Sequence, residues 1–406
     1  MKVINNGTIT DVKGFKATGM TAGIKKSGRK DLALIYSEEK AVAAAVFTQN
    51  LVKAAPILLN MKNIKSENIQ AIIINSGNAN ACTGEEGYQN AVRMTEIVSK
   101  ELNLLPNEVL IESTGIIGVQ LDMDKIEKGL KKITVKLDTD GGYDAGEAIM
   151  TTDTFPKNIA VKIKIDGKEV IIGGVAKGSG MIHPDMATML SFLTTDVSID
   201  KELLQKAFST SSDKTYNMIS VDGDTSTNDM AGILANGAAG NKKITDENSE
   251  DYKIFKEALD YVNEELAKLI AKDGEGATKL IEVTTKNAKT MKDARKVAKS
   301  VITSSLFKAA VFGSDPNWGR ILCAVGYSGA ELSVNNVDIF IKGHKDMVQV
   351  AKNGMGIKFK EDVAEKILGE EKVGVIIDLH DGDFDAVAWG CDLTYDYVRI
   401  NADYRT

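Results

Sequence analysis

The chain is organised around one central segment, Gly173-Gly174-Val175-Ala176-Lys177-Gly178-Ser179-Gly180-Met181-Ile182-His183-Pro184-Asp185-Met186-Ala187-Thr188-Met189-Leu190. Its glycines open positive φ to the backbone, while Pro184 fixes its own φ and biases His183 away from helix. The apolar run over residues 189–193 predicts a buried strand. The segment therefore predicts a flexible loop that ends where Thr188 opens a strand.

A threonine in this place could attack the carbonyl of the residue before it. If the Ala187 carbonyl is held out of plane, an N-to-O acyl shift followed by hydrolysis would split the chain between Ala187 and Thr188. An α-amine has a reference pKa of roughly 7.7–8.0, so the new amine could take the proton from Thr188 Oγ1. Such a threonine carries its own base and matches the Ser-His-Asp arrangement by role.

Two other interpretations of the loop need no chemistry of this kind. Glycines before an apolar run are typical of an ordinary turn, and spacing alone favours that interpretation. The pair Gly178 and Gly180 also resembles the start of a dinucleotide fingerprint. However, His183 occupies the third glycine position, and no helix is expected to follow.

Composition limits the classes of function. The 406 residues are 43% hydrophobic, which is enough for a sizeable core and for two or three lobes. The net charge of −7, without a cluster of Lys and Arg among aromatics, argues against a nucleic-acid surface. No run approaches the roughly 18 apolar residues of a membrane span, and no signal peptide is recognisable, so we expect a cytoplasmic protein.

The spacing of the cysteines and of one acidic run argues against a metal centre. The chain has three cysteines, Cys82, Cys323 and Cys391, which are widely separated and lack metal-ligand spacing. We expect them to be reduced and buried. The run from Ser220 to Asp229 superficially resembles a calcium loop, but its glycine is misplaced and the final Glu is absent, so a polar turn near the site is expected.

The remaining periodicity predicts an alternation of strands and helices. Strands are expected within residues 8–60 and over 71–74, 109–112, 161–172 (a hairpin around Asp166-Gly167), 280–285, 337–341 and 373–379. Helices are expected over 88–98, 125–132, 143–150, 201–208, 254–270 and 291–303. The C-terminal residues 393–406 have strand-like alternation at Tyr395, Tyr397 and Val398.

The fourteen residues from Lys177 to Leu190 resemble the cleavage and nucleophile motif of the ornithine acetyltransferase (glutamate N-acetyltransferase) family of arginine biosynthesis. The resemblance covers the whole chain. It implies a layered α/β sandwich of two β-sheets with flanking helices, similar to N-terminal-nucleophile architecture. It also implies cleavage into an α chain, residues 1–187, and a β chain, residues 188–406, which assemble as an α2β2 heterotetramer.

The resemblance also implies roles for individual residues. A Thr-Gly turn at the end of a strand can direct a hydroxyl and a backbone N–H at one point, although composition alone fits a plain turn. In the family pattern, Thr114 and Gly115 form the oxyanion hole. The substrate-binding residues it implies are Thr151 (with Thr152 as the second choice), Lys177, Thr188, Glu275, Asn401 and Thr406. Asn78, Trp318 and Arg320 receive no role.

The function implied is acetyl transfer from N2-acetyl-L-ornithine to L-glutamate through an acetyl-Thr188 intermediate. Glu275 suits an ornithine ammonium group, and Lys177 suits an α-carboxylate. Neither a metal nor a bound organic cofactor is expected, and the use of acetyl-CoA as a co-substrate stays open. The alternatives are an N-terminal-nucleophile amidohydrolase or aminopeptidase and a non-catalytic ligand-binding α/β protein.

Overall fold

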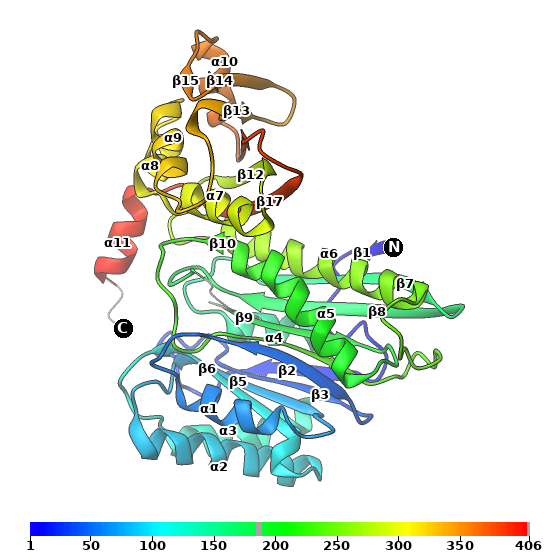
Figure 1. Ribbon diagram of the computed structural model, residues 1–406. Coiled ribbons are helices and arrows are strands. Elements are labelled where there is room, and N and C mark those ends of the chain that lie inside the picture. Colours follow the sequence, from blue (N-terminus) through cyan, green and yellow to red (C-terminus); the bar gives the residue numbers. More distant parts are fainter. Residues whose placement is uncertain (184–188, 404–406) are drawn as a thin grey trace.

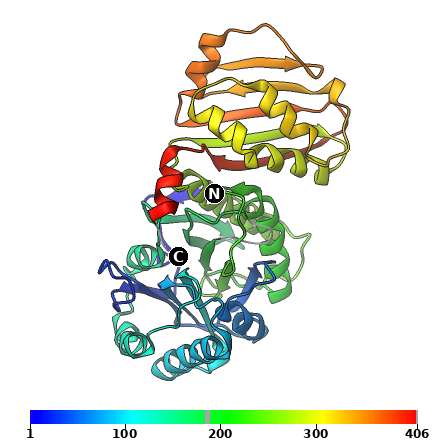
Figure 2. The same cartoon turned by 90° about the vertical axis from the view of Figure 1, so that its left-hand side faces the viewer.

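The computed structural model describes residues 1–183 and 189–403 (Figure 1). Its strands form three sheets of four, six and seven strands, which are stacked one above another along the molecule. The four- and six-stranded sheets make the lower body. The seven-stranded sheet forms a C-terminal lobe that stands apart from this body in the rotated view (Figure 2).

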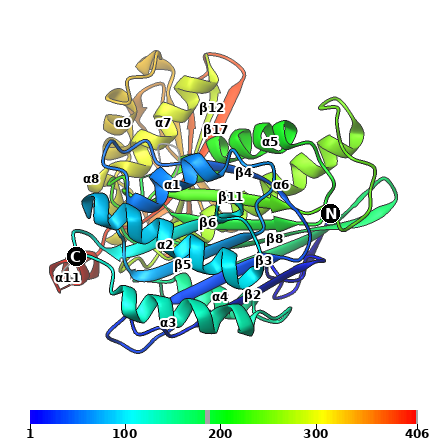
Figure 3. The ribbon, with the colours of Figure 1, turned by 90° about the horizontal axis from the view of Figure 1, so that it is seen from below.

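The four-stranded sheet has the order β2-β3-β5-β6 and contains a parallel pair, β5 and β6. Its strands are β2 (Phe15–Met20), β3 (Leu32–Ser37), β5 (Ala71–Asn78) and β6 (Val109–Ile116). On its outer face lie α1 (Ala55–Asn63), α2 (Gly84–Leu102) and α3 (Met123–Ile133), as the view from below shows (Figure 3). Because parallel strands end at the same edge, β5 and β6 bring their terminal loops together.

The six-stranded sheet has the order β1-β7-β8-β9-β11-β4. Its strands are β1 (Lys2–Ile4), β7 (Lys157–Ile165), β8 (Lys168–Lys177), β9 (Leu190–Thr195), β11 (Met230–Ala235) and β4 (Val42–Phe47). Side chains such as Phe15 and Ile72 from one sheet and Phe192 from the other form the core between the two sheets. The helix α4 (Gly142–Ile149) also contributes to this core, while α5 (Lys201–Lys214) and α6 (Glu250–Lys272) cover the opposite face of the six-stranded sheet.

The seven-stranded sheet has the order β10-β17-β12-β16-β13-β14-β15. Its strands are β10 (Ile219–Ser220), β17 (Phe384–Cys391), β12 (Leu280–Ala288), β16 (Lys372–Asp378), β13 (Asp338–Lys342), β14 (Met347–Lys352) and β15 (Met355–Gly356). The helices of this lobe are α7 (Met291–Thr303), α8 (Ser305–Phe312), α9 (Trp318–Gly326) and α10 (Glu361–Leu368), and α11 (Tyr395–Asp403) follows β17. Short 3-10 turns are η1 (Pro106–Glu108), η2 (Thr134–Lys136), η3 (Tyr216–Met218) and η4 (Val334–Asn336).

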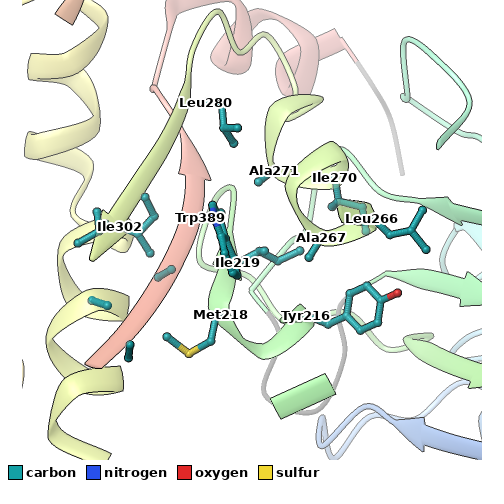
Figure 4. Packing of buried hydrophobic residues seen from close by; sticks show 14 of the residues in the cluster. Tyr216, Met218, Ile219, Leu266, Ala267, Ile270, Ala271, Leu280, Ile302 and Trp389 are labelled. Carbon is teal, nitrogen blue, oxygen red and sulfur yellow. The ribbon is translucent and has the colours of Figure 1, made fainter. Parts of the chain in front are cut away.

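One continuous apolar cluster joins the lobe to the body. Leu266 and Ile270 of α6 pack in the same cluster as Trp389 of β17 and Ile219 of β10 (Figure 4). Helix α6 therefore serves both regions, and it leads directly into the 273–279 turn at their junction. None of the described helices is long and apolar enough to span a bilayer.

The structure confirms the predicted layered α/β fold, and the sandwich of two sheets is its lower body. The predicted hairpin is also confirmed, because β7 and β8 pair along their whole length around Asp166 and Gly167. These two residues have φ values of 49° and 72°, as a type I′ turn requires. The third sheet was not separated from the other two by any feature of the sequence that we could identify.

Two expectations were wrong. The C-terminal residues form the helix α11 and not a strand, because the Thr394 hydroxyl accepts the backbone N–H of Asp396 at 3.2 Å and caps the helix. Tyr395 is 84% exposed, so its alternation with Tyr397 does not mark a buried strand. Of the cysteines, only Cys391 is buried, while Cys82 and Cys323 are exposed; all three are free thiols.

Candidate functional site

A pocket lies where the end of β6, the end of β8 and the 273–279 turn meet. Its volume, including the open mouth, is about 760 Å³. Six of the predicted site residues line it, namely Thr114, Gly115, Thr151, Lys177, Glu275 and Asn401. Ala187, Thr188 and Thr406 lie outside the described residues, and Met189, which follows Thr188 in the sequence, lines the pocket.

The end of β6 presents Thr114 and Gly115. Lys177 Nζ donates a hydrogen bond to Thr114 Oγ1 at 3.2 Å. Since an ammonium group only donates, the Thr114 hydroxyl accepts here and keeps its own O–H to donate. Gly115 has φ +130°, and a Cβ there would come 2.5 Å from the carbonyl carbon of Gly77 on β5. Only glycine therefore lets the two strand ends approach this closely.

Lys177, the last residue of β8, is 8% exposed. Burial lowers the pKa of its ammonium group, and the carboxylate of Asp153 opposes that effect. Asp229 and Glu275 act in the same direction as Asp153. Lys177 thus places a buried amino group in a wall that also carries the Thr114 hydroxyl, and two donors side by side suit a carboxylate or a polarised carbonyl oxygen.

The loop after α4 brings Thr151 and Thr152 to the pocket wall. Asp153 holds this loop, because its Oδ2 accepts the backbone N–H of Thr151 at 2.9 Å. Thr154 points elsewhere, and its backbone N–H binds Asp273 Oδ2 at 3.0 Å. Among the three threonines of the hydroxyl-rich run, Thr151 and Thr152 are therefore the ones placed for contact with a ligand.

The opposite wall carries a carboxylate. Glu275 is 8% exposed, and its Oε2 accepts a hydrogen bond from Asn401 Nδ2 of α11 at 2.7 Å. A Cβ at Gly180 would come 2.4 Å from the Glu275 carboxylate, so a larger residue there would displace this carboxylate. Gly276 has φ +68° and abuts the backbone of Tyr397, which brings α11 against the 273–279 turn.

The first part of the central loop is fixed by backbone bonds to the run that resembled a calcium loop. Asp222 accepts the N–H groups of Met181 at 2.6 Å and Ile182 at 2.9 Å. Both carboxylate oxygens of Asp222 are thereby engaged with the loop backbone. His183 lies beside Ser220 with Nδ1 3.1 Å from Oγ, and burial lowers its pKa to about 4, so its ring is neutral at pH 7.

The sequence did not single out the individual residues from Ser226 to Asp229, which line the pocket beside Met189. Asp229 is 3% exposed, and within the described part of the chain its Oδ2 has no hydrogen-bond partner. Burial raises its pKa well above the usual range for a carboxyl group. The run was predicted as a polar turn near the site, but only the pairing of β11 with β9 shows why it adjoins Met189.

Three residues without an assigned role have structural contacts. Asn78 Nδ2 donates to the carbonyl of Val119 at 3.0 Å. Arg320 donates to the carbonyl of Leu306 at 2.8 Å, and the Trp318 ring lies against Gly356 of β15. Trp318 and Arg320 belong to the C-terminal lobe and do not line the pocket.

Comparison with known proteins identifies the family. A family model described as "ArgJ family" matches residues 16–406. The chain belongs to the ArgJ family. It is 56% identical over 406 residues to the arginine biosynthesis bifunctional protein ArgJ 1 of Clostridium acetobutylicum, with coverage of 100% of this chain and 99% of that protein. It is 55% identical to the ArgJ protein of Caldanaerobacter subterraneus subsp. tengcongensis, with coverage of 99% and 100%.

Solved structures of ArgJ proteins are also similar. The ornithine acetyltransferase of Mycobacterium tuberculosis, solved in complex with ornithine, is 38% identical; the match covers 46% of this chain and 99% of that chain, with a TM-score of 0.42. The ArgJ protein of Bacillus halodurans is 41% identical, with coverage of 46% and 97% and a TM-score of 0.43. The family membership confirms the resemblance found in the sequence and, with it, an acyltransferase of arginine biosynthesis.

Proposed function

We propose that this ArgJ protein transfers an acetyl group from N2-acetyl-L-ornithine to L-glutamate, with Thr188 as nucleophile after cleavage of the Ala187–Thr188 bond. The observation that carries the proposal is the pocket itself. Side chains from five distant segments, Thr114, Thr151, Lys177, Glu275 and Asn401, surround one volume. They include a cation, a carboxylate and several hydroxyl or amide groups, which together match an N-acylated, zwitterionic amino acid.

In the first half-reaction, Thr188 Oγ1 bonds to the acetyl carbon, and its proton passes to the α-amine of Thr188. Negative charge develops on the carbonyl oxygen, where the free O–H of Thr114 and the backbone N–H of Gly115 stabilise it. The carbon–nitrogen bond then breaks, and the α-amine returns its proton to the departing ornithine nitrogen. Acetyl-Thr188 remains.

In the second half-reaction, the amine of glutamate attacks the acetyl ester and regenerates the Thr188 hydroxyl. Lys177 binds the α-carboxylate of either amino acid, and Glu275, held by Asn401, binds the side-chain ammonium of ornithine. Thr151 contributes a hydroxyl contact. Thr406 is proposed as a further substrate contact, as is an assembly of two α and two β chains.

The two proposed chains share one sheet. Strand β8 precedes the cleavage point and β9 follows it, and the two strands pair from Ile172 and Thr195 to Lys177 and Leu190. β11, from the second chain, pairs in turn with β4 of the first. Cleavage would therefore leave the two products joined by continuous strand pairing.

A denaturing gel together with an acetyl-transfer assay tests the proposal. The purified protein should give two bands and transfer acetyl from N2-acetyl-L-ornithine to glutamate, whereas Thr188→Ala should give one full-length band and no transfer, since alanine has no hydroxyl. Thr195→Ala, at the far end of β9, is the matched control and should still be cleaved. An uncleaved wild-type chain with full transfer activity would refute the cleavage step.

The same assay separates the remaining possibilities. Release of acetate in place of acetylglutamate would indicate the amidohydrolase alternative, because both share the acyl-enzyme. Since the relatives are named bifunctional, acetyl-CoA is the second donor to compare, with glutamate as acceptor. Acetylglutamate formed from both donors would assign two activities to this pocket.

A further inference from the structure

Behind the pocket lies a lysine that the proposed reaction does not use. Lys157 Nζ is 2.7 Å from Asp153 Oδ1 and 2.6 Å from Asp273 Oδ2. The Lys157 and Asp153 side chains are completely buried, and Asp273 is 3% exposed. Such a buried arrangement persists only when further hydrogen bonds satisfy the charged groups. We call these three residues the Asp153–Lys157–Asp273 cluster.

Asp153 ties two walls of the pocket together. Its Oδ2 accepts the backbone N–H of Thr151, and its Oδ1 accepts the N–H of Gly178 at 2.7 Å. Gly178 directly follows Lys177 and starts the central loop. One carboxylate thus sets the position of the Thr151 loop relative to the end of β8.

Asp273 ties in the third wall. Its carboxylate accepts both the N–H and the hydroxyl of Thr154. Its backbone carbonyl accepts the Ser179 hydroxyl at 2.6 Å, and the Ser179 carbonyl accepts the N–H of Glu275 at 3.0 Å. The cluster is therefore linked by hydrogen bonds to the loop that carries Lys177 and to the turn that carries Glu275.

The cluster also acts on Lys177 through charge. Two carboxylates and one ammonium leave it with a net charge of −1. Burial raises the pKa of Asp153, but the ammonium groups of Lys157 and Lys177 outweigh burial and hold that pKa well below its usual range. The titratable groups that face Lys177 from the surrounding elements are Asp153, Lys157, Asp229, Glu275 and Lys25.

We propose that the Asp153–Lys157–Asp273 cluster positions the substrate pocket, and that Asp153 supplies the negative charge that keeps Lys177 cationic for the carboxylate of an amino-acid substrate. Asp153, Lys157 and Asp273 are positioning residues, since none of them lines the pocket together with Lys177. The inference rests on the proposed function for the identity of the ligand.

Opposite substitutions give the test. Asp153→Asn removes a negative charge and should lower the pH at which Lys177 loses its proton. Lys157→Gln removes a positive charge and should raise it. The binding of L-ornithine is measured by titration calorimetry between pH 6 and 10, because binding requires no turnover. The titration of ornithine itself is the same in every variant, so only differences from wild type are interpreted.

For Asp153→Asn, we expect the alkaline loss of ornithine binding to move to lower pH by about one pH unit or more. This is the usual displacement when an opposite charge close to a titrating group is removed. For Lys157→Gln, we expect the alkaline loss of ornithine binding to move to higher pH. Asp196→Asn is the matched control. Asp196 is 4% exposed and accepts the N–H of Ile171 at 2.9 Å, toward the other end of β8, so no displacement is expected. Thermal unfolding identifies a variant that fails to fold. In that case, the direction in which the other variant displaces the pH dependence of binding decides whether the proposal stands.

The outcomes separate the two proposals. Displacements in opposite directions support the cluster, even if acetyl transfer is absent and the proposed function fails. If the wild type transfers acetyl but both variants bind ornithine like Asp196→Asn, the proposed role of the cluster is overturned and the proposed function stands. The same holds if both variants displace the pH dependence of binding in the same direction. A wild-type protein that binds no ornithine at any pH overturns both.

Discussion

The ion pairs at the pocket and two ion pairs of the C-terminal lobe differ in how far they are exposed to water. At the pocket, Lys157 is completely buried between two aspartates. In the lobe, Lys289 pairs with Glu331 while 50% of the lysine side chain stays exposed, and Lys372 pairs with Glu282 at 56% exposure. Exposed pairs contribute about 0–1 kcal/mol, whereas buried pairs must overcome a desolvation cost of several kcal/mol.

This difference shows which charges the molecule holds for a reason other than stability. A buried pair is often no more stabilising than apolar residues of the same volume, so its presence beside a pocket indicates a requirement of the site. The lobe has no comparable requirement in its described ion pairs. Trp318 and Arg320, to which the sequence assigned no role, make structural contacts in this lobe.

The largest expected effect is at the pocket. Thr114→Ala should lower the turnover of acetyl transfer by about 10²–10³, because one donor to the developing oxyanion is lost. Thr114→Ser keeps the hydroxyl and should retain most of the rate. Steady-state assays with N2-acetyl-L-ornithine measure both variants. An unchanged rate in Thr114→Ala would show that the Thr114 hydroxyl has only a structural role. The end of β6 would then not differ from the lobe in its effect on the reaction.

The lobe should respond in stability and not in rate. Trp318→Ala removes a partly buried ring that packs against Gly356. We expect the free energy of unfolding to fall by about 2 kcal/mol, which is less than the roughly 3–5 kcal/mol for a fully buried tryptophan. The KM and kcat of the folded variant should match the wild type. Urea unfolding and the transfer assay are measured on the same sample, with Tyr327→Ala, an aromatic that is 60% exposed, as the control. A selective loss of kcat would connect the lobe to the chemistry.

The smallest expected effect concerns how the free energy of unfolding depends on pH. Glu112 on β6 is completely buried, and burial raises its pKa well above the usual range. The stability that its neutral carboxyl contributes is complete below the unfolded pKa of about 4.3 and is lost as pH rises through the folded pKa.

Glu112→Gln should therefore flatten the decline in the free energy of unfolding above about pH 5, by at most about 1.4 kcal/mol per pH unit. Denaturant unfolding at several pH values measures the slope. Lys289→Ala in the lobe should leave the slope unchanged, since its pair is exposed. Identical slopes for Glu112→Gln and wild type would mean that Glu112 is ionised in the folded protein.

Much of the fold could be predicted from local pattern. The helix over 291–303 and the hairpin around Asp166-Gly167 have clear periodicity and turn chemistry, and the structure has both. The resemblance also placed Thr114, Lys177 and Glu275 at the site, and the structure brings them to one pocket. Periodicity alone left each of them open to a plain structural interpretation, because a turn looks the same whether or not a ligand touches it.

What local pattern could not provide depends on burial and on contacts between distant segments. Tyr395 and Tyr397 alternate like a strand, but they have no sheet to join, and the Thr394 cap makes that segment a helix. Lys157 and Asp273 are 116 residues apart, and nothing in either neighbourhood distinguishes them from surface charges. They become a cluster only because the end of α6 and the start of β7 pack together and exclude water, and it is this exclusion that makes their charges matter to Lys177.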